Sequence, residues 1–298
     1  SLHDALPISH AGAITAVRAE APCQLVPRVD IIADGKTMLF SAPFWFASLG
    51  SADRPVRHAN ARVTTPPSGF TASQNYTFEA IGSVDFATID GVRTKDSNFR
   101  TSGLSLFQAR IQFGAYADQF VGGGATVVAG TTPTTLELWT SELVEIPDSA
   151  GRLPAIPFLK KVSYQDISTP TANSALEQRL PAGNLLRGVM IRTDGTGTAG
   201  EPSTALLNAA KLQSGVDVRM DMTGPQIRAK NNLDIGPITA GYYSLDVLAI
   251  GPNAQKMSEL FDVTRQAEPR LVMDVAGPFA SARMQLVTIE YIPAQPGA

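Results

Sequence analysis

The stretch Val29-Asp30-Ile31-Ile32-Ala33-Asp34-Gly35-Lys36-Thr37-Met38-Leu39-Phe40 decides the class of fold. It places Asp34-Gly35 between two runs of β-forming residues, and a type I′ turn needs a positive φ at both of its central residues. The stretch therefore predicts a β-hairpin. Behind Pro43, the run Phe44-Trp45-Phe46 is predicted to fill the core, because aromatic side chains bury large apolar areas.

Further short strands are predicted beyond this hairpin. Residues 51–73 are loop-like, a composition that is typical of a functional or interface-forming excursion inside a β domain. Residues 146–157 contain three prolines and one glycine, which cannot lie in a sheet ladder, so this span is predicted to link two domains. The predicted strands of the first half are residues 76–81, 84–89, 104–113 and 134–143.

The second half repeats this style with about eight candidate strands, which is the number that a jelly roll requires. One short helical turn is predicted at residues 226–231, after Gly224-Pro225. The eight candidate strands are residues 160–166, 175–180, 185–192, 206–213, 216–221, 242–249, 270–276 and 283–291.

The predicted fold class is therefore all-β, with two consecutive eight-stranded jelly-roll β-sandwiches, a double jelly roll. The predicted division is an irregular N-terminal arm at residues 1–22, an N-terminal jelly roll at 23–146, a linker at 147–157 and a C-terminal jelly roll at 158–298. Two domains of this size are each large enough to bury a core.

Charge and cysteine content narrow the class of function. The net charge is −3, and the first 22 residues carry only Arg18 as a fixed positive charge, so direct contact with nucleic acid is not expected. The single cysteine, Cys23, excludes an internal disulfide and a cysteine-based metal site, and it is predicted to be a small buried apolar residue.

No motif predicts catalysis, a cofactor or a small-molecule substrate. The segment Gly195–Gly200 matches a dinucleotide fingerprint by spelling, but Glu201-Pro202 and a β-like stretch follow it where a long helix is needed. The three histidines, His3, His10 and His58, lie in the N-terminal tail and in a loop, which argues against a cupin metal site or a catalytic triad. The chain is therefore not predicted to be an enzyme.

The carboxylates have no recognisable ligand spacing, so they are predicted to form turns and to face solvent, and a structural calcium ion at a subunit contact is the alternative. They are Asp85, Asp90, Asp96, Glu201, Asp217 and Asp221.

One charged loop is the candidate for contacts between subunits. Arg93, Lys95 and Arg100 cluster around Asp96, an arrangement that suits inter-subunit ion pairs or, alternatively, a solvated loop.

Several short segments resemble the corticovirus-like double jelly-roll major capsid proteins of tailless, membrane-containing viruses. The resemblance covers most of the chain from about residue 24 onward and has no single diagnostic motif. The segments are residues 27–31, 89–93, 180–192, 212–215, 233–236, 240–243, 271–275 and 290–293.

This resemblance implies a major capsid protein that acts in the virion and is made and assembled in the host cytoplasm. It implies a homotrimer with a pseudo-hexagonal outline that tiles an icosahedral shell around an internal membrane. The implied partners are neighbouring capsomers and the vertex and internal-membrane proteins of the virion. The resemblance carries over no catalytic residue.

Two other classes remain open from the sequence. The main alternative is a β-sandwich carbohydrate- or receptor-binding protein, such as a spike, an adhesin or a lectin. Trp45 and Trp139 lie beside apolar, strand-like residues, so they are predicted to lie in the core rather than in a ligand groove. A glycoside hydrolase would need two carboxylates facing one cleft, and no such pair stands out.

Overall fold

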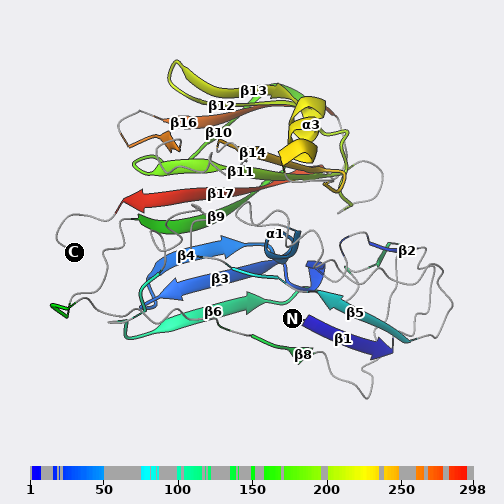
Figure 1. Cartoon of the computed structure of the whole chain (residues 1–298). Coiled ribbons are helices and arrows are strands. Elements are labelled where there is room, and N and C mark those ends of the chain that lie inside the picture. The colour runs from blue at the N-terminus through cyan, green and yellow to red at the C-terminus, as the bar shows by residue number, and fades with distance from the viewer. Residues whose placement is uncertain are drawn as a thin grey trace.

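The structure is a computed structural model, and it is all-β, as predicted (Figure 1). It describes residues 2–7, 16–18, 20, 23–49, 75–80, 82–84, 86, 99–101, 104–115, 118, 120–121, 135–138, 140, 149–151, 158–168, 171–195, 201–234, 238–247, 260–264, 268–277 and 282–293.

The C-terminal half is a sandwich of two four-stranded sheets, β14-β11-β17-β9 and β10-β16-β12-β13. The chain alternates between the two sheets in the manner of a jelly roll. All eight strands predicted for this half are confirmed. Their bounds are β9 Phe158–Ser168, β10 Asn173–Arg179, β11 Leu185–Asp194, β12 Leu207–Ser214, β13 Asp217–Thr223, β14 Tyr242–Asp246, β16 Pro269–Val275 and β17 Arg283–Pro293, with the short strand β15 Phe261–Asp262 pairing with β11.

Apolar side chains of the two sheets meet inside this sandwich and form the C-terminal core. In β16 every second residue is buried, which is the pattern of a strand with one face on a core and one on solvent. We define the C-terminal core by its fully buried strand residues, which include Val189, Ile191, Leu207, Ala210, Leu212, Leu271, Met273, Val275, Met284 and Leu286.

One helix, α3 (Gly224–Asp234), covers an edge of the sandwich beside β14 (Figure 1). It is longer than the single turn predicted at residues 226–231. The Asn231 side chain of α3 donates a hydrogen bond to the Ser244 carbonyl and accepts one from the Ser244 amide, each at 2.8 Å. Asn231 therefore holds α3 against β14.

The N-terminal half contributes β3 (Arg28–Ala33), β4 (Thr37–Ala42) and β6 (Phe107–Gln112), which pair in the order β4-β3-β6. The helix α1 (Phe44–Leu49) follows β4, and the short 3-10 helix η1 (Cys23–Leu25) precedes β3. The remaining described strands of this half are β5 Asn75–Ala80, β7 Phe120–Val121 and β8 Thr135–Leu136.

The predicted hairpin is confirmed as β3-β4, and both central residues have the expected backbone, with φ of 50° at Asp34 and 67° at Gly35. Ala33 pairs with Thr37, so the loop has three residues rather than two. The Asp34 carboxylate accepts a hydrogen bond from the Ser105 amide at 2.7 Å, which ties the loop to the segment before β6. In the C-terminal half, Gly215 and Val216 form the loop between β12 and β13.

One expectation about local structure needs correction. The arm at residues 1–22 is not wholly irregular, because β1 (Leu2–Pro7) pairs with β5 and β8, and β2 (Ala16–Val17) pairs with β7. Pairing with distant strands supplies the order that local periodicity did not predict. Most of the predicted linker, residues 147–157, lies outside the described residues; residues 149–151 form a turn.

Candidate functional site

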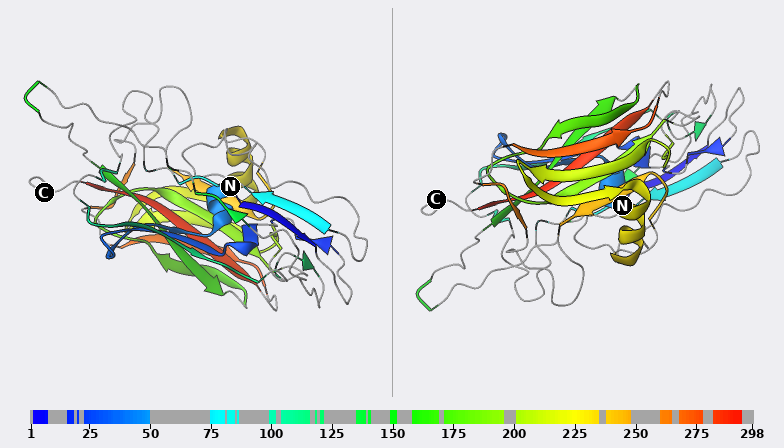
Figure 2. Two further views of the ribbon diagram at one scale, coloured as in Figure 1. Left: turned by 90° about the horizontal axis from the view of Figure 1, so that it is seen from below. Right: turned by 90° about the horizontal axis from the view of Figure 1, so that it is seen from above.

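The two halves of the chain meet at a seam, where β4 and β9 pair in parallel through Phe40 and Val162. This pairing joins the sheets into one continuous path, β14-β11-β17-β9-β4-β3-β6. The long strands of both halves run in broadly the same direction (Figure 2). One sheet of each half is therefore hydrogen-bonded to a sheet of the other half.

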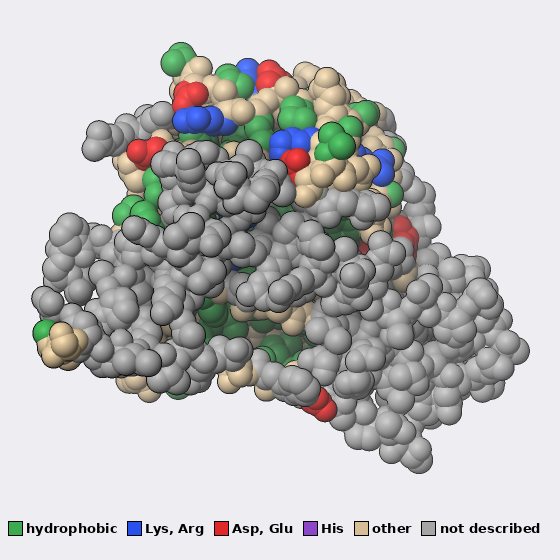
Figure 3. Space-filling model, viewed as in Figure 1, with side chains coloured by type: hydrophobic (Ala, Val, Ile, Leu, Met, Phe, Trp, Pro, Cys, Tyr) green, Lys and Arg blue, Asp and Glu red, His purple; other side chains and the backbone are tan. Residues whose placement is uncertain are grey.

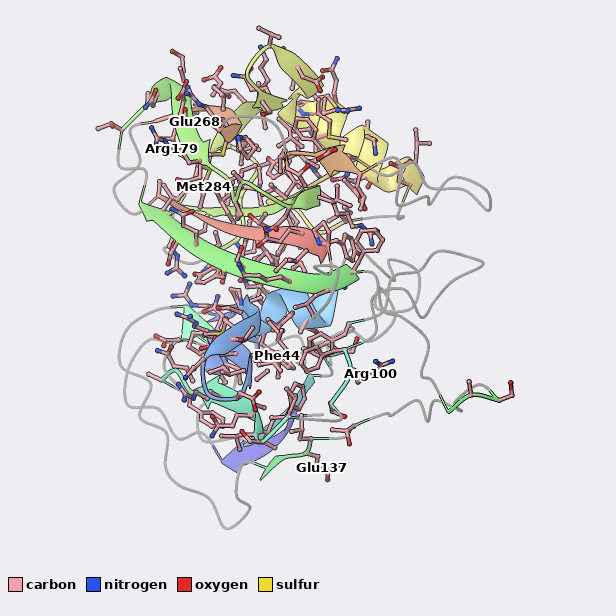
Figure 4. The ribbon with its side chains drawn as sticks, turned by 90° about the vertical axis from the view of Figure 1, so that its left-hand side faces the viewer. Phe44, Arg100, Glu137, Arg179, Glu268 and Met284 are labelled. Atoms are coloured by element: carbon pink, nitrogen blue, oxygen red, sulfur yellow. The ribbon has the colours of Figure 1, made fainter. Side chains whose placement is uncertain are left out.

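An apolar cluster drawn from both halves fills the seam. From the N-terminal half it includes Cys23, Ile31, Phe40, Ala42, Trp45 and Phe46, and from the C-terminal half Val162, Met190, Tyr242, Val287 and Ile289. Phe44, on α1, packs against the cluster and is labelled in Figure 4. The sheet β14-β11-β17-β9 is thus covered on one face by its own sandwich partner and on the other by the N-terminal half.

Trp45 is the aromatic anchor of the seam. It is 5 % exposed, and its ring centroid lies 5.2 Å from that of Tyr242. Its indole nitrogen donates a hydrogen bond to Gln285 of β17 at 2.8 Å, and the Gln285 amide donates to the Tyr164 hydroxyl at 2.9 Å. Burial is the main reason why the pKa of Tyr164 is raised to about 12. The predicted core position of Trp45 is confirmed, whereas Trp139 lies outside the described residues.

A buried ion pair crosses the seam next to Gln285. Arg192 of β11 binds both carboxylate oxygens of Glu20, with its Nε 2.6 Å from Oε1, and its Nη1 donates to Asp194 at 2.7 Å. Arg192, Glu20 and Asp194 are 1 %, 3 % and 0 % exposed. Burial alone lowers the pKa of Arg192, but Glu20 and Asp194 outweigh it, and the pKa is raised overall.

Asp194 is also held from the other side, because Arg283 donates to it through its side chain at 3.1 Å and through its backbone amide at 3.2 Å. Asp194 therefore lies between two guanidinium groups. Buried charges in proteins are usually paired in this way, because an unpaired buried charge is strongly unfavourable.

The same sheet carries other buried charges. Arg187 pairs with Asp246 at 3.0 Å, and the pKa of Tyr291 is raised by burial against the lowering influence of Arg187. Glu290 accepts a hydrogen bond from Asn184 and pairs with Lys161 at 3.2 Å. Sequence reasoning missed these residues. The available signal was a charged residue inside a strand whose neighbours are apolar on both faces, as at Arg187 and Arg192.

The predicted inter-subunit residues are not brought together within the described part of the chain. Arg93, Lys95 and Asp96 lie outside it, and Arg100 is partly buried in the N-terminal half (Figure 4). His3 lies on β1 opposite Glu79, while His10 and His58 also lie outside the described residues.

No group of three or more metal-ligating side chains occurs among the described residues, and none of the described helices has the length and apolar character of a membrane span. Three of the carboxylates singled out from the sequence are described, and each lies near a cation: Asp217 near Arg219, Asp221 near Lys211 and Glu201 near Arg18. Their arrangement indicates solvated ion pairs and not a catalytic dyad. Asp85, Asp90 and Asp96 lie outside the described residues.

The described surface carries both ion pairs and exposed apolar side chains. On the outer sheet of the C-terminal half, Arg270 pairs with Glu177 at 2.9 Å and with Glu268 at 2.5 Å, and Arg179 lies 3.7 Å from Glu268 (Figure 4). Charged side chains also gather on this part of the molecule in Figure 3. Among the described residues, both halves also expose large apolar side chains: Leu106, Phe107, Phe113, Leu136 and Leu138 in the N-terminal half, and Val216, Val218 and Leu233 in the C-terminal half.

Comparison with solved structures identifies the fold. The structure matches the major capsid protein of Sulfolobus turreted icosahedral virus with a TM-score of 0.64 and 13 % identity, over 98 % of this chain and 87 % of that one. It matches the major capsid protein of bacteriophage PM2 with a TM-score of 0.51 and 12 % identity, over 99 % and 93 % of the two chains.

A third match is the PBCV-1 protein Vp54, whose crystal structure was fitted into a reconstruction of the virophage Sputnik. Its TM-score is 0.55 and its identity 14 %, over 97 % of this chain and 85 % of that one. No protein-family model and no curated protein sequence matches the chain. The all-β architecture, the complete C-terminal jelly roll and these near-full-length matches agree: the chain has the double jelly-roll fold of viral major capsid proteins.

Proposed function

We propose that this chain is a major capsid protein, which forms homotrimers with a pseudo-hexagonal outline that tile an icosahedral virion shell. Its partners are then further copies of itself in the trimer, neighbouring capsomers, and vertex and internal-membrane proteins, with assembly in the host cytoplasm. The chain performs no catalysis in this role. The matched proteins of Sulfolobus turreted icosahedral virus and bacteriophage PM2 are major capsid proteins, and the fold is shared along almost the whole chain.

The observation that carries the proposal is the seam. Two similar sandwiches in one chain give a three-fold assembly a nearly six-fold outline, which packs a lattice with few kinds of contact. This works only if the angle between the sandwiches is fixed. A continuous sheet, a shared apolar cluster and a buried ion pair fix that angle here.

The surfaces support roles for both halves in assembly. The exposed Phe107, Phe113 and Leu138 of the N-terminal half are 43 %, 57 % and 67 % exposed. Large apolar side chains in such positions are typical of contacts with other proteins. We place the loop with Arg93, Lys95, Asp96 and Arg100 at an inter-subunit contact as well, because paired charges fix the register of an interface.

The first experiment is the solution mass of the full chain, by light scattering after size exclusion. The full chain is required because Glu20 is part of the seam. We expect a mass near three times 31.5 kDa, followed by shell-like assemblies in electron micrographs. A stable monomer that does not associate at high concentration contradicts the proposal.

Charge reversal tests the proposed contact loop. The variants Arg93→Glu and Arg100→Glu are expected to impair assembly without unfolding the monomer, which the circular dichroism spectrum checks. Arg100 is partly buried, so its variant is also expected to lower the thermal unfolding midpoint. Normal particles from both variants count against the loop as an interface. Trp45, the tryptophan among the described residues, is buried and so does not line a carbohydrate-binding groove.

A further inference from the structure

The segment that precedes the N-terminal sandwich contacts both halves of the molecule. We call its described residues, Arg18, Glu20 and Cys23–Leu25, the N-terminal strap. Towards its end the strap is bound to the N-terminal half, because Gly114 donates a backbone hydrogen bond to the Leu25 carbonyl at 2.9 Å. Leu25 and Val26 pack against Val29, Phe44 and Ile111.

The beginning of the strap is bound to the C-terminal half through charges. Glu20 holds Arg192 through both carboxylate oxygens, and Arg18 lies 3.9 Å from Glu201. Gln24 donates to the Glu20 carboxylate at 3.1 Å, and the Cys23 amide donates to the Glu20 carbonyl at 2.6 Å. The turn of the strap thus presents Glu20 to β11 in one orientation.

This ion pair differs in kind from the surface pairs of the C-terminal sheet. Both partners are at least 97 % buried, since Arg192 is 1 % and Glu20 3 % exposed. Removing one member of a buried pair leaves an uncompensated charge, which is strongly destabilising, whereas replacing both by apolar groups is often neutral. The pair therefore fixes position more than it adds stability.

We propose that the N-terminal strap is a clasp that locks the two sandwiches at one relative orientation and that opens without unfolding either of them. Its latch is the Glu20–Arg192 pair. Loss of the pair frees the part of the strap around Glu20 from β11, while the strands of the C-terminal core keep their own contacts. This proposal concerns the isolated chain and does not rest on capsid assembly.

Cys23 supplies a direct measurement of opening. It is the only cysteine in the chain, it belongs to the strap and it is 3 % exposed. Its rate of alkylation in the folded protein therefore reports the population of the open strap, in the same way as amide exchange reports local opening.

The test uses Arg192→Met, which leaves Glu20 buried without its guanidinium partner. We expect alkylation of Cys23 to accelerate by about 100-fold or more. Amide exchange in β12 and β16 of the C-terminal core is expected to stay within about threefold of the parent. The exposed pair provides a matched control, because Arg270→Met is expected to leave the alkylation rate within about twofold.

A second variant keeps the proposal testable where Arg192→Met does not fold. In the double variant Glu20→Met with Arg192→Met, both charges are absent, and the alkylation rate is expected to return to within about tenfold of the parent. Glu20→Gln alone is expected to accelerate alkylation by at least about tenfold. The proposal is overturned if the alkylation rate of Cys23 is unchanged in Glu20→Gln. It is also overturned if amide exchange in β12 and β16 accelerates by the same factor as the alkylation of Cys23.

Discussion

The C-terminal core and the seam lie on opposite faces of the same sheet, β14-β11-β17-β9, and they are built differently. On β11, Val189 and Ile191 point to the core, whereas Met190 belongs to the seam cluster and Arg192 carries the buried ion pair. The core is formed almost entirely by aliphatic and other apolar side chains. The seam adds an indole–amide hydrogen bond and the Glu20–Arg192 pair to its apolar residues.

This difference reflects what each face has to specify. Apolar burial is non-directional. It drives two sheets together, but several packings of similar volume have similar stability. Hydrogen bonds and paired charges depend on distance and angle, so a partner that is displaced leaves buried polar groups unsatisfied. The core holds the sandwich together, and the seam determines where the second sandwich lies.

The largest expected effect is at the anchor of the seam. Trp45→Ala is expected to lower the free energy of unfolding by about 3–5 kcal/mol, because it opens a cavity between the halves and leaves Gln285 without its donor. Trp45→Phe, which keeps most of the volume, is expected to cost about 1–3 kcal/mol through the lost hydrogen bond. Urea unfolding measures both, and a cost below about 1 kcal/mol for Trp45→Ala would show that the halves are independent.

A somewhat smaller effect is expected on the opposite face. Leu271 is fully buried in the C-terminal core, and Leu271→Ala is expected to cost about 2–4 kcal/mol through lost transfer energy and a residual cavity. Because the core is separate from the strap, alkylation of Cys23 under native conditions is expected to change little. A large acceleration of alkylation would show that core and seam open as one unit.

The free energy of unfolding is expected to fall at alkaline pH because of Cys23, which belongs to the seam cluster. Burial is the main cause that raises the pKa of Cys23 from 9.0 to about 12, so the folded thiol stays protonated where the unfolded thiol ionises. Stability from this group is complete below pH 9 and is lost as the pH rises towards 12. Unfolding of the parent and of Cys23→Ala across this range isolates the contribution, and equal slopes would contradict it.

The smallest effect is expected outside both regions. Val216 lies at the tip of the β12-β13 hairpin and is fully exposed, so Val216→Ser is expected to change the free energy of unfolding by no more than about 0.5 kcal/mol. The same urea experiment measures it. A cost comparable with that of Leu271→Ala would mean that the hairpin tip is packed against another part of the chain.

Patterns of neighbouring residues predicted the fold well where a strand obeys its own periodicity. The eight strands of the C-terminal jelly roll and the Asp34-Gly35 hairpin were predicted from local sequence, and the structure confirms them. The run around Trp45 was correctly predicted to be buried, although it lies in the helix α1 rather than in a strand. Three aromatic residues in sequence indicate burial but do not distinguish helix from strand.

The seam was not predicted, because its contacts join residues that are far apart in the chain. Glu20 and Arg192 are 172 positions apart, and Trp45 and Gln285 are 240 apart. Glu20 lies in a segment without periodicity, which was expected to be irregular. The pairing of Glu20 with Arg192 depends on how the two halves of the chain pack together. The residues next to Glu20 in the sequence do not indicate that packing.

Asn231 also closes one edge of the large sheet, at β14. β14 is an edge strand, and without Asn231 its Ser244 amide and carbonyl would be free to pair with a strand of another molecule. Such an open edge promotes aggregation. The Asn231 side chain occupies both groups, as a further strand would, but it cannot continue the ladder. Growth by strand addition therefore stops at this edge, and association there has to be directed by side chains rather than by backbone pairing.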